Sequence, residues 1–273
     1  MTILITGATG KTGSLVAAGT RAAGAPVRTA ARHGADVPFD WYAPDTWAAA
    51  LDGVRRAYLV PPPGFDVAPA MLPFVRLAHD RGVERLVLLS NSVLGRGGPG
   101  VGAVHAALTG DDVALRPSWF MQNVTGAHPL AQMIRDEDQI VNAAGEGRIG
   151  FIDAADIAAV AVRALLDDPA PPAELVLTGP QALSFREVAA IVGEARGRAV
   201  AYHPVTPDEQ ARRLSAHYPP TFARMLADAD ALLASGAEDR VTTAVPDVTG
   251  HPARSFAEFA ADAFTASPGF GPR

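Results

Sequence analysis

The sequence contains no cysteine, and Lys11 is its only lysine. The lack of cysteine excludes disulfides, thiolate nucleophiles and cysteine-bound metals. The histidines and acids are too scattered along the chain to suggest another metal site, so we expect none. No apolar run approaches the roughly 20 residues that a membrane-spanning helix needs. The net charge of −6 disfavours nucleic acids and anionic membranes as partners.

The first apolar run begins at Thr2, which leaves no room for a signal peptide. We therefore expect a cytoplasmic protein, a monomer or a homodimer, whose partner is a small-molecule substrate. Hydrophobic residues make up 48% of the 273 residues, which is enough for a sizeable core.

Apolar runs alternate with helical patterns in the first half of the chain. Strands are expected at 2–7, 25–32, 56–63, 84–92 and 112–118, and helices at 11–23, 44–51, 67–80 and 101–108. The strands are almost continuously apolar, as in a parallel sheet covered on both faces. This alternation predicts an α/β protein with a Rossmann-type doubly wound parallel sheet.

The second half is less regular. We expect strands at 139–143 and 174–179, and helices at 154–166, 184–196, 207–216, 220–235 and 255–265. Ser184 and Glu187 form a capping box, and Pro129 must kink or restart a helix expected over 120–135. We predict one domain over 1–273. Its Rossmann core covers about 1–180, and a small C-terminal lobe covers about 181–273, with a contribution from 120–150.

The stretch ILITGATGKTG places Gly7, Gly10 and Gly13 directly after a strand and at the start of a helix. The first glycine allows a tight turn, the second lets the backbone approach a pyrophosphate, and the third allows close helix–strand packing. Unpaired N–H groups at the helix start favour an anion. The pattern predicts a dinucleotide site, although a plain tight turn would need similar residues.

The second strand ends in Arg32 and His33, and no acid follows until Asp36. An NAD site usually has an acid at this position for the ribose hydroxyls, whereas arginine suits a 2′-phosphate. We therefore expect NADP(H), with Lys11 able to reach the same phosphate. Alternatively, Arg32 is a solvated loop residue. Asp40 and Trp41 are expected beside the adenine, although Trp41 would also fit the core.

The expected cofactor site gathers the residues that follow the parallel strands. They are Gly7, Ala8, Thr9, Gly10, Lys11, Thr12, Gly13, Arg32, His33, Asp40, Trp41, Val60, Pro61, Pro62, Ser90, Asn91, Ser92 and Pro117.

The glycine stretch occurs together with LRPSWFMQN, GEGRIGFIDAADIAAVAVRAL and a late TGHPARSFAEFAAD segment. With these motifs the chain resembles the NmrA-like branch of atypical short-chain dehydrogenases/reductases over nearly its whole length. It is most similar to the ergot-alkaloid reductase type and to bacterial NAD(P)H quinone reductases. The resemblance implies a Rossmann core, a C-terminal lobe that forms the substrate cleft, and NADP(H). It does not imply a substrate, because the branch also holds regulators that bind dinucleotide without turnover.

Ordinary short-chain reductases use a tyrosine and a lysine four residues later on one helix face to protonate a carbonyl oxygen. Four residues after the four tyrosines of this chain stand Thr46, Pro62, Thr206 and Phe222. That pair is therefore absent, and with it the standard ketone chemistry.

Two possibilities remain for catalysis. An iminium ion or a quinone needs no strong acid from the protein. For such acceptors, positioning alone would supply most of the catalysis. Otherwise another side chain serves, and the weak candidates are Ser92, His105 and Asn123. The favoured alternative for His105 is a partly exposed surface histidine.

Trp119, Phe120 and Asn123 follow the strand at 112–118 and are expected to line the substrate cleft, with His217 and Tyr218 on a lid. They would also fit simple packing of the lobe. We predict an NADPH-dependent reductase of an activated acceptor, such as a quinone, an iminium ion or a related polycyclic intermediate of secondary metabolism. The alternatives are an NADP(H)-sensing regulatory protein without turnover, and a non-redox isomerase, dehydratase or cyclase.

Overall fold

The computed structural model describes residues 2–265 and contains a seven-stranded sheet within them, in which all neighbouring strands are parallel. In sheet order the strands are β3 (Val37–Pro38), β2 (Val27–Ala31), β1 (Thr2–Thr6), β4 (Val54–Leu59), β5 (Arg85–Leu89), β6 (Val113–Pro117) and β9 (Glu174–Leu177). The chain builds outward from β1 to β3 and then crosses to β4. The carboxyl ends of β1 and β4 therefore form the switch point of the sheet, where ligands bind in this class of fold.

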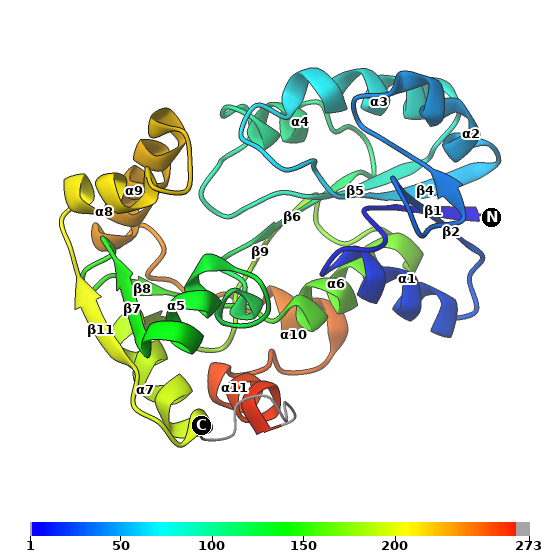
Figure 1. The fold of residues 1–273 in the computed structure, drawn as a ribbon. Coiled ribbons are helices and arrows are strands. Elements are labelled where there is room, and N and C mark those ends of the chain that lie inside the picture. The colour runs from blue at the N-terminus through cyan, green and yellow to red at the C-terminus, as the bar shows by residue number, and fades with distance from the viewer. Residues whose placement is uncertain (1, 266–273) are drawn as a thin grey trace. The chain divides into compact units, whose positions relative to one another are not determined.

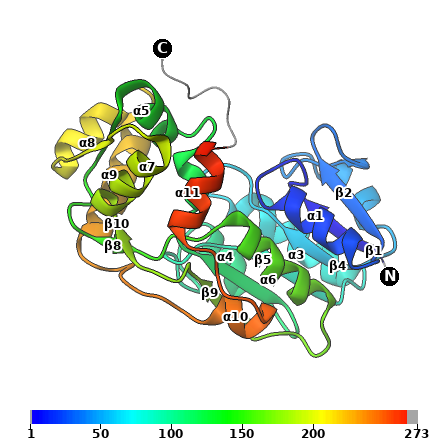
Figure 2. The same cartoon turned by 90° about the horizontal axis from the view of Figure 1, so that it is seen from below.

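Helices cover both faces of this sheet (Figure 1). One layer contains α1 (Gly13–Ala22), α6 (Ala154–Leu166) and α10 (Ala244–Thr249), and the other contains the 3₁₀ turn η1 (Pro44–Thr46), α2 (Trp47–Leu51), α3 (Ala68–Asp80) and α4 (Val101–Ala106). Helices α1 and α6 lie side by side (Figure 2), because Gly19 has no side chain and an added Cβ would lie 2.9 Å from Val162 Cγ2. The prediction of a doubly wound α/β sheet is confirmed.

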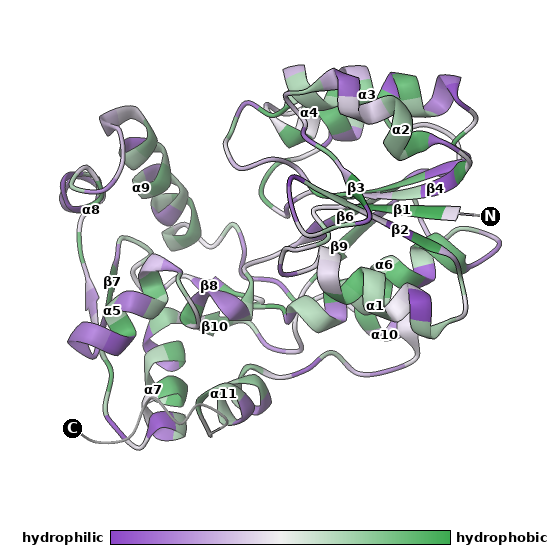
Figure 3. Ribbon diagram, turned by 45° about the vertical axis from the view of Figure 1, so that its right-hand side comes forward, coloured by the Kyte–Doolittle hydropathy of each residue, from purple (hydrophilic) through white to green (hydrophobic). Residues whose placement is uncertain are grey.

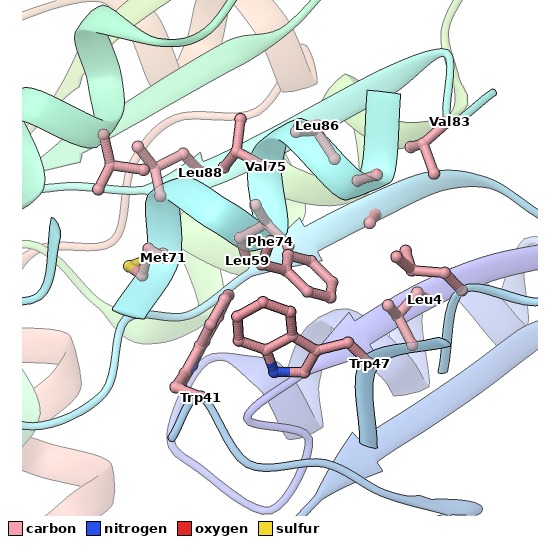
Figure 4. Close-up of a cluster of buried hydrophobic side chains, with 14 of the residues drawn as sticks. Leu4, Trp41, Trp47, Leu59, Met71, Phe74, Val75, Val83, Leu86 and Leu88 are labelled. Carbon is pink, nitrogen blue, oxygen red and sulfur yellow. The ribbon is translucent and has the colours of Figure 1, made fainter. Parts of the chain in front are cut away.

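The core on the α2–α3–α4 face is built around aromatic side chains (Figure 4). The ring of Phe74 on α3 meets Trp41 at 5.1 Å, Trp47 at 5.6 Å and Phe39 at 5.3 Å, each close to edge-on. Edge-to-face pairs of this kind add to the free energy of simple burial. The loop after β3 is therefore held in place by the packing of Trp41 on Phe74.

Two buried arginines lie at the amino end of the same sheet. Arg56 on β4 and Arg85 on β5 are register partners, and both guanidinium groups contact the carboxylate of Asp168, at 2.7 Å and 3.1 Å. They also donate to backbone carbonyls at the end of α6, those of Leu165 and Ala164. Since the carboxyl end of a helix carries partial negative charge, α6 and Asp168 together neutralise the buried pair.

The chain divides into two compact units. The first contains the sheet and comprises residues up to Pro117, Ala154–Leu177 and Thr243–His251. The second comprises Ser118–Asp153, Thr178–Thr242 and the chain from Pro252. Residues 243–251, which fall within the expected lobe of about 181–273, belong to the first unit, where α10 packs on α6 and β9.

The second unit contains two small two-stranded sheets and several helices. Strand β10 (Leu183–Ser184) pairs with β8 (Arg148–Ile149), and β11 (Ala201–Pro204) pairs with β7 (Gln139–Asn142). The helical segments are η2 (Met121–Val124), α5 (Pro129–Glu137), α7 (Phe185–Arg196), α8 (Pro207–Leu214), α9 (Pro220–Ala234) and α11 (Phe256–Thr265).

Most expected elements form, and the differences are local. The capping box at Ser184 is present, and Pro129 begins α5 instead of kinking a longer helix, because proline is tolerated in a first helical turn. The short strands β3, β8, β10 and β11 and the helix α10 were not expected from the sequence.

The polarity of the helices follows their burial. Figure 3 shows α6 as largely hydrophobic and α8 as largely hydrophilic, and α6 has seven buried residues. Among residues 2–265 no helix has the length and apolar character needed to cross a membrane.

A buried carboxyl group lies inside the second unit. Asp230 on α9 is 8% exposed, and its Oδ2 accepts hydrogen bonds from Gln210 Nε2 at 3.0 Å and from the Ala143 backbone N–H at 3.2 Å. Burial raises the pKa of Asp230 from its ordinary value of 3.8 to about 6.

This raised pKa predicts a pH-dependent stability. The folded state holds a proton that the unfolded state releases above pH 3.8, so the stabilisation is complete below that pH and is lost as the pH rises through 6. Asp230→Asn keeps an oxygen for both hydrogen bonds and removes the titration. The stability of this variant relative to the parent should therefore rise by about 2 kcal/mol between pH 4.5 and pH 7.5. Urea unfolding at both pH values measures this, with Asp228→Asn on the exposed side of α9 as control. An unchanged difference would refute the buried titration.

Candidate functional site

The glycine turn after β1 is held by very close backbone contacts. Gly7 has φ +60°, and its carbonyl oxygen accepts from the Gly10 N–H at 2.9 Å. An added Cβ on Gly13 would lie 2.2 Å from that same oxygen, and one on Gly7 would lie 2.8 Å from Val60 Cβ. The first and third glycines are therefore required by the turn itself, which packs the first turn of α1 against the loop.

The helix start faces an open surface. Gly10, Lys11 and Ser14 are exposed, and Thr12, at the N-cap of α1, makes no side-chain capping bond. Partial burial lowers the pKa of the Lys11 ammonium below its ordinary value. The uncapped N–H groups and the nearby ammonium form an electropositive surface that suits an anion.

A cavity of about 420 Å³ opens beside this turn, within the range of small-molecule sites. It lies at the ends of β1, β2 and β4, and thus at the switch point of the sheet. Its lining residues are Gly7, Thr9, Gly10, Ala31, Arg32, His33, Phe39, Asp40, Trp41, Tyr42, Val60, Pro61, Pro62 and Pro63. Ten of the residues expected to hold a cofactor are thus brought together, from Gly7 to Pro62, although their role in binding stays a prediction.

The charged side chains at the end of β2 differ in their partners. Asp36, the first acid after the strand, accepts from the Thr29 backbone N–H at 2.8 Å and pairs with Arg21 at 3.4 Å. The hydrogen bond from Thr29 holds the pKa of Asp36 below its ordinary value, so this carboxylate is charged. Arg32 is exposed at the cavity and does not share that partner. The cavity therefore presents the guanidinium of Arg32 to a ligand, and Asp36, the acid that follows Arg32 in the sequence, is partnered by other groups.

Trp41 is a core residue that borders the cavity, and its neighbour Tyr42 is exposed there. Trp41 is 7% exposed, its ring packs on Phe74 (Figure 4), and its Nε1 donates to the Val60 carbonyl at 2.9 Å. The core alternative for Trp41 is thus what the structure shows, with one side of the residue still lining the cavity. Tyr42 lines the same cavity and is 66% exposed, and the sequence reasoning missed it.

Asp40 supports this turn. Its Oδ1 accepts from the Tyr42 N–H at 2.9 Å, and its backbone carbonyl accepts from Trp47 Nε1 at 2.9 Å. A local signal for Tyr42 existed, since an aspartate that accepts from the N–H two residues later forms a turn, and turn residues commonly lie at the surface.

The segment after β5 is held by one arginine. Arg116 on β6 donates to the Asn91 carbonyl at 3.2 Å and to the Ser92 carbonyl at 2.7 Å, and it pairs with Glu174 on β9. Asn91 Oδ1 accepts from the Leu94 N–H at 2.8 Å. The guanidinium fork therefore fixes the backbone of residues 91 and 92, which the sequence placed at the cofactor.

The expected exposure of His105 was wrong. Its side chain is 1% exposed, and its Nε2 lies 3.6 Å from Glu174 Oε2, beyond a good hydrogen bond. Burial lowers the pKa of His105 below its ordinary value and outweighs the attraction of Glu174. His105 is therefore a neutral, buried residue of α4, and Ser92 is buried as well.

The residues expected in the substrate cleft all lie in the second unit. Trp119 packs against the core of that unit, Phe120 pairs with Ile152, and Asn123 lies in η2. His217 is exposed after α8, and the ring of Tyr218 contacts Phe222 at 5.5 Å. Their role toward a substrate stays a prediction.

The remaining expected cofactor residues lie outside the large cavity. Ala8, Thr12 and Pro117 are buried, Lys11 is exposed and Gly13 closes the turn, while Ser90 and Asn91 line a second, smaller cavity. In the part of the chain that the structure describes, no group of three or more His, Asp or Glu side chains could hold a metal ion.

Known proteins resemble this chain over almost its full length. The uncharacterized oxidoreductase YesF of Bacillus subtilis is 43% identical over 95% of this chain and 94% of its own. The agroclavine dehydrogenase of Claviceps fusiformis is 39% identical over 96% and 97%. No protein-family model matches. Among solved structures, an NADPH-dependent quinone oxidoreductase of Escherichia coli in complex with NADPH has a TM-score of 0.80 at 23% identity, over 97% of this chain and 100% of that one.

The fold is Rossmann-type α/β, with a glycine turn at its switch point. The chain belongs to the NmrA-like family of atypical short-chain dehydrogenases/reductases, and it is an oxidoreductase.

Because of the close contacts in the glycine turn, we expect one added methyl group at Gly13 to destabilise the protein. Gly13→Ala forces a Cβ against the Gly7 carbonyl and should destabilise the protein by about 1–3 kcal/mol, as overpacking does. Because the start of α1 must shift, dinucleotide affinity should fall as well. Gly95→Ala is the control, since nothing lies within 4 Å of its added Cβ. Thermal unfolding and dinucleotide titration of both variants measure this, and equal behaviour would contradict the proposed contact.

Proposed function

We propose that this chain binds NADP(H) in the large cavity of its first unit. The observation that carries the proposal is the charge pattern at the end of β2, where Arg32 faces the cavity and Asp36 is committed to Thr29 and Arg21. The planar guanidinium of arginine suits a phosphate oxygen pair. The pyrophosphate fits the N–H groups at the start of α1, where a side chain on Gly7 or Gly13 would not fit.

We further propose that the reaction is the reduction of an activated acceptor, a quinone or an iminium ion. NADPH, when bound, supplies the hydride. The chain lacks the tyrosine–lysine pair that protonates ketones, since its single lysine lies in the glycine turn. A quinone can take its proton from water after the hydride arrives, and an iminium ion needs none. In this proposal the residues of the chain bind and orient both reactants, and this positioning supplies the rate acceleration.

The names of similar proteins support an NAD(P)H-dependent oxidoreductase, and one of them supports a quinone as the acceptor. They include agroclavine dehydrogenase, an NAD(P)H azoreductase of Xenophilus azovorans at 32% identity, and the quinone oxidoreductase. A non-redox reaction would need an acid or base in contact with the substrate, such as Ser92, His105 or an aspartate. It is disfavoured because the side chains of Ser92 and His105 are both buried.

The test is NADPH oxidation by a panel of quinones, iminium ions and plain ketones, alongside titrations with NADPH and NADH. Turnover with quinones or iminium ions but not with ketones would support the proposal. Tight NADPH binding without turnover would instead indicate a regulatory dinucleotide sensor. One neighbouring structure is NmrA, a negative transcriptional regulator in complex with NAD, with a TM-score of 0.76 at 17% identity.

Arg32 should select the phosphorylated cofactor. Arg32→Ala should raise the Kd for NADPH by about 10–100-fold and leave the Kd for NADH nearly unchanged, because a charge-assisted bond to phosphate is worth about 1.5–3 kcal/mol. Arg76→Ala, which removes an exposed arginine of α3, is the matched control. Calorimetric titration of both cofactors measures the effect. Equal losses of affinity for NADPH and NADH would refute the assignment of Arg32 to the phosphate.

A further inference from the structure

The loop 32–36, which carries Arg32, joins two parallel strands that are neighbours in the sheet. Ala30 of β2 and Val37 of β3 are partners in register, so the chain must double back within this loop. Connections between neighbouring parallel strands usually need a dozen residues or more. Gly34, with φ +70°, supplies the left-handed turn that such a short return requires.

Two reciprocal hydrogen bonds close the base of this loop. The Thr29 N–H donates to Asp36 Oδ2 at 2.8 Å, and the Asp36 N–H donates to Thr29 Oγ1 at 2.9 Å. Each side chain thus satisfies the backbone N–H of the other residue. Arg21 on α1, which lies beside β2 (Figure 2), contacts the same carboxylate at 3.4 Å. Because both side chains of this ion pair are about half exposed, the pair adds little to the two hydrogen bonds.

Packing does little to hold the loop, because the loop borders open space at both of its ends. Arg32 and His33 line the large cavity, and residues 34–36 line a separate groove together with Ser14 and Arg21 of α1. Among residues 2–265 the Arg32 guanidinium makes no hydrogen bond or ion pair of its own. The position of Arg32 is therefore set by the backbone of the loop, and the backbone is set by the hydrogen bonds at its base.

We propose that Thr29 and Asp36 are positioning residues for the 2′-phosphate of NADP(H), because their paired hydrogen bonds hold the loop that presents Arg32 to the large cavity. Neither residue lines that cavity, so both act through Arg32. The inference rests on the proposed function and deepens it, since it assigns the selectivity for the phosphorylated cofactor to a pair of residues outside the cavity.

The charge of Asp36 makes the sign of the effect decisive. A carboxylate repels a nearby phosphate, so its removal would strengthen NADPH binding if charge alone mattered. Positioning predicts the opposite for Asp36→Ala, which removes a negative charge and should nevertheless weaken the binding of an anion. Asp36→Asn keeps an oxygen that can accept from the Thr29 N–H, and it should bind NADPH at least as tightly as the parent.

Calorimetric titration measures these effects with NADPH, NADH, adenosine 2′,5′-bisphosphate and adenosine 5′-monophosphate. Asp36→Ala should raise the Kd for the two ligands with a 2′-phosphate by about three- to tenfold, the range expected for a lost hydrogen bond. The Kd for the two ligands without it should stay constant. Thr29→Val, which removes the hydroxyl, should have the same effect, and Thr29→Ser, which keeps it, should restore the affinity of the parent.

A double variant separates positioning from general damage to the fold. If Asp36 acts through Arg32, Asp36→Ala should add nothing to the Kd for NADPH once Arg32→Ala is present. General damage would weaken NADPH and NADH alike in both backgrounds. Asp80→Ala is the matched control, because it removes an exposed carboxylate at the carboxyl end of α3. Thermal unfolding shows whether each variant is folded, and the two Thr29 variants carry the test if Asp36→Ala is not.

The outcomes distinguish this inference from the proposed function. If Arg32→Ala loses the preference for NADPH but Asp36→Ala and Thr29→Val keep it, the positioning role is overturned and the proposed function stands. Tighter NADPH binding by Asp36→Ala would also overturn the positioning role, because the charge of Asp36 would then be its main effect. If the unchanged protein does not bind NADPH, the proposed function fails and this inference fails with it.

Discussion

The whole site depends on how closely the start of α1 approaches the end of β1. The Gly7 carbonyl accepts from the Gly10 N–H and lies where a side chain on Gly13 would be, so the turn closes only with glycine at both ends. Its third contact, Gly7 against Val60, brings the glycine turn to the segment after β4. Since Val60 lines both cavities, this contact also sets where they meet.

The electrostatics around this turn are arranged by hydrogen bonds to backbone groups. Asp36 accepts from the Thr29 N–H and pairs with Arg21, and Arg116 donates to the carbonyls of residues 91 and 92. The first arrangement leaves a cation at the large cavity, and the second fixes the wall of the small one. Both arrangements use a charged side chain to hold the backbone in place. The cost in desolvation free energy is small because each charge keeps an oppositely charged partner.

The proposed chemistry follows from the absence of the tyrosine–lysine pair, since the single lysine of the chain lies in the glycine turn. Without that pair the proposed site offers no strong acid to a ketone oxygen. The proposed function therefore assigns the chain to acceptors that need no such acid, and it assigns most of the catalysis to the positioning of the two reactants.

The sequence by itself determined the features that depend on neighbours along the chain. The alternation of apolar runs predicted the doubly wound sheet, the glycine spacing predicted the turn, and Ser184 with Glu187 predicted a cap that forms as expected. The arginine after β2 and the lack of a nearby acid were also visible, because they concern adjacent residues.

Only the tertiary structure decided which side chains are buried by partners far away in sequence. Trp41 enters the core because Phe74, on a helix some thirty residues later, packs against it, and Tyr42 is left at the cavity. His105 is buried beside Glu174, and residues 243–251 join the sheet unit through α6 and β9. Such contacts depend on chain segments that meet only after folding, and no local pattern encodes them.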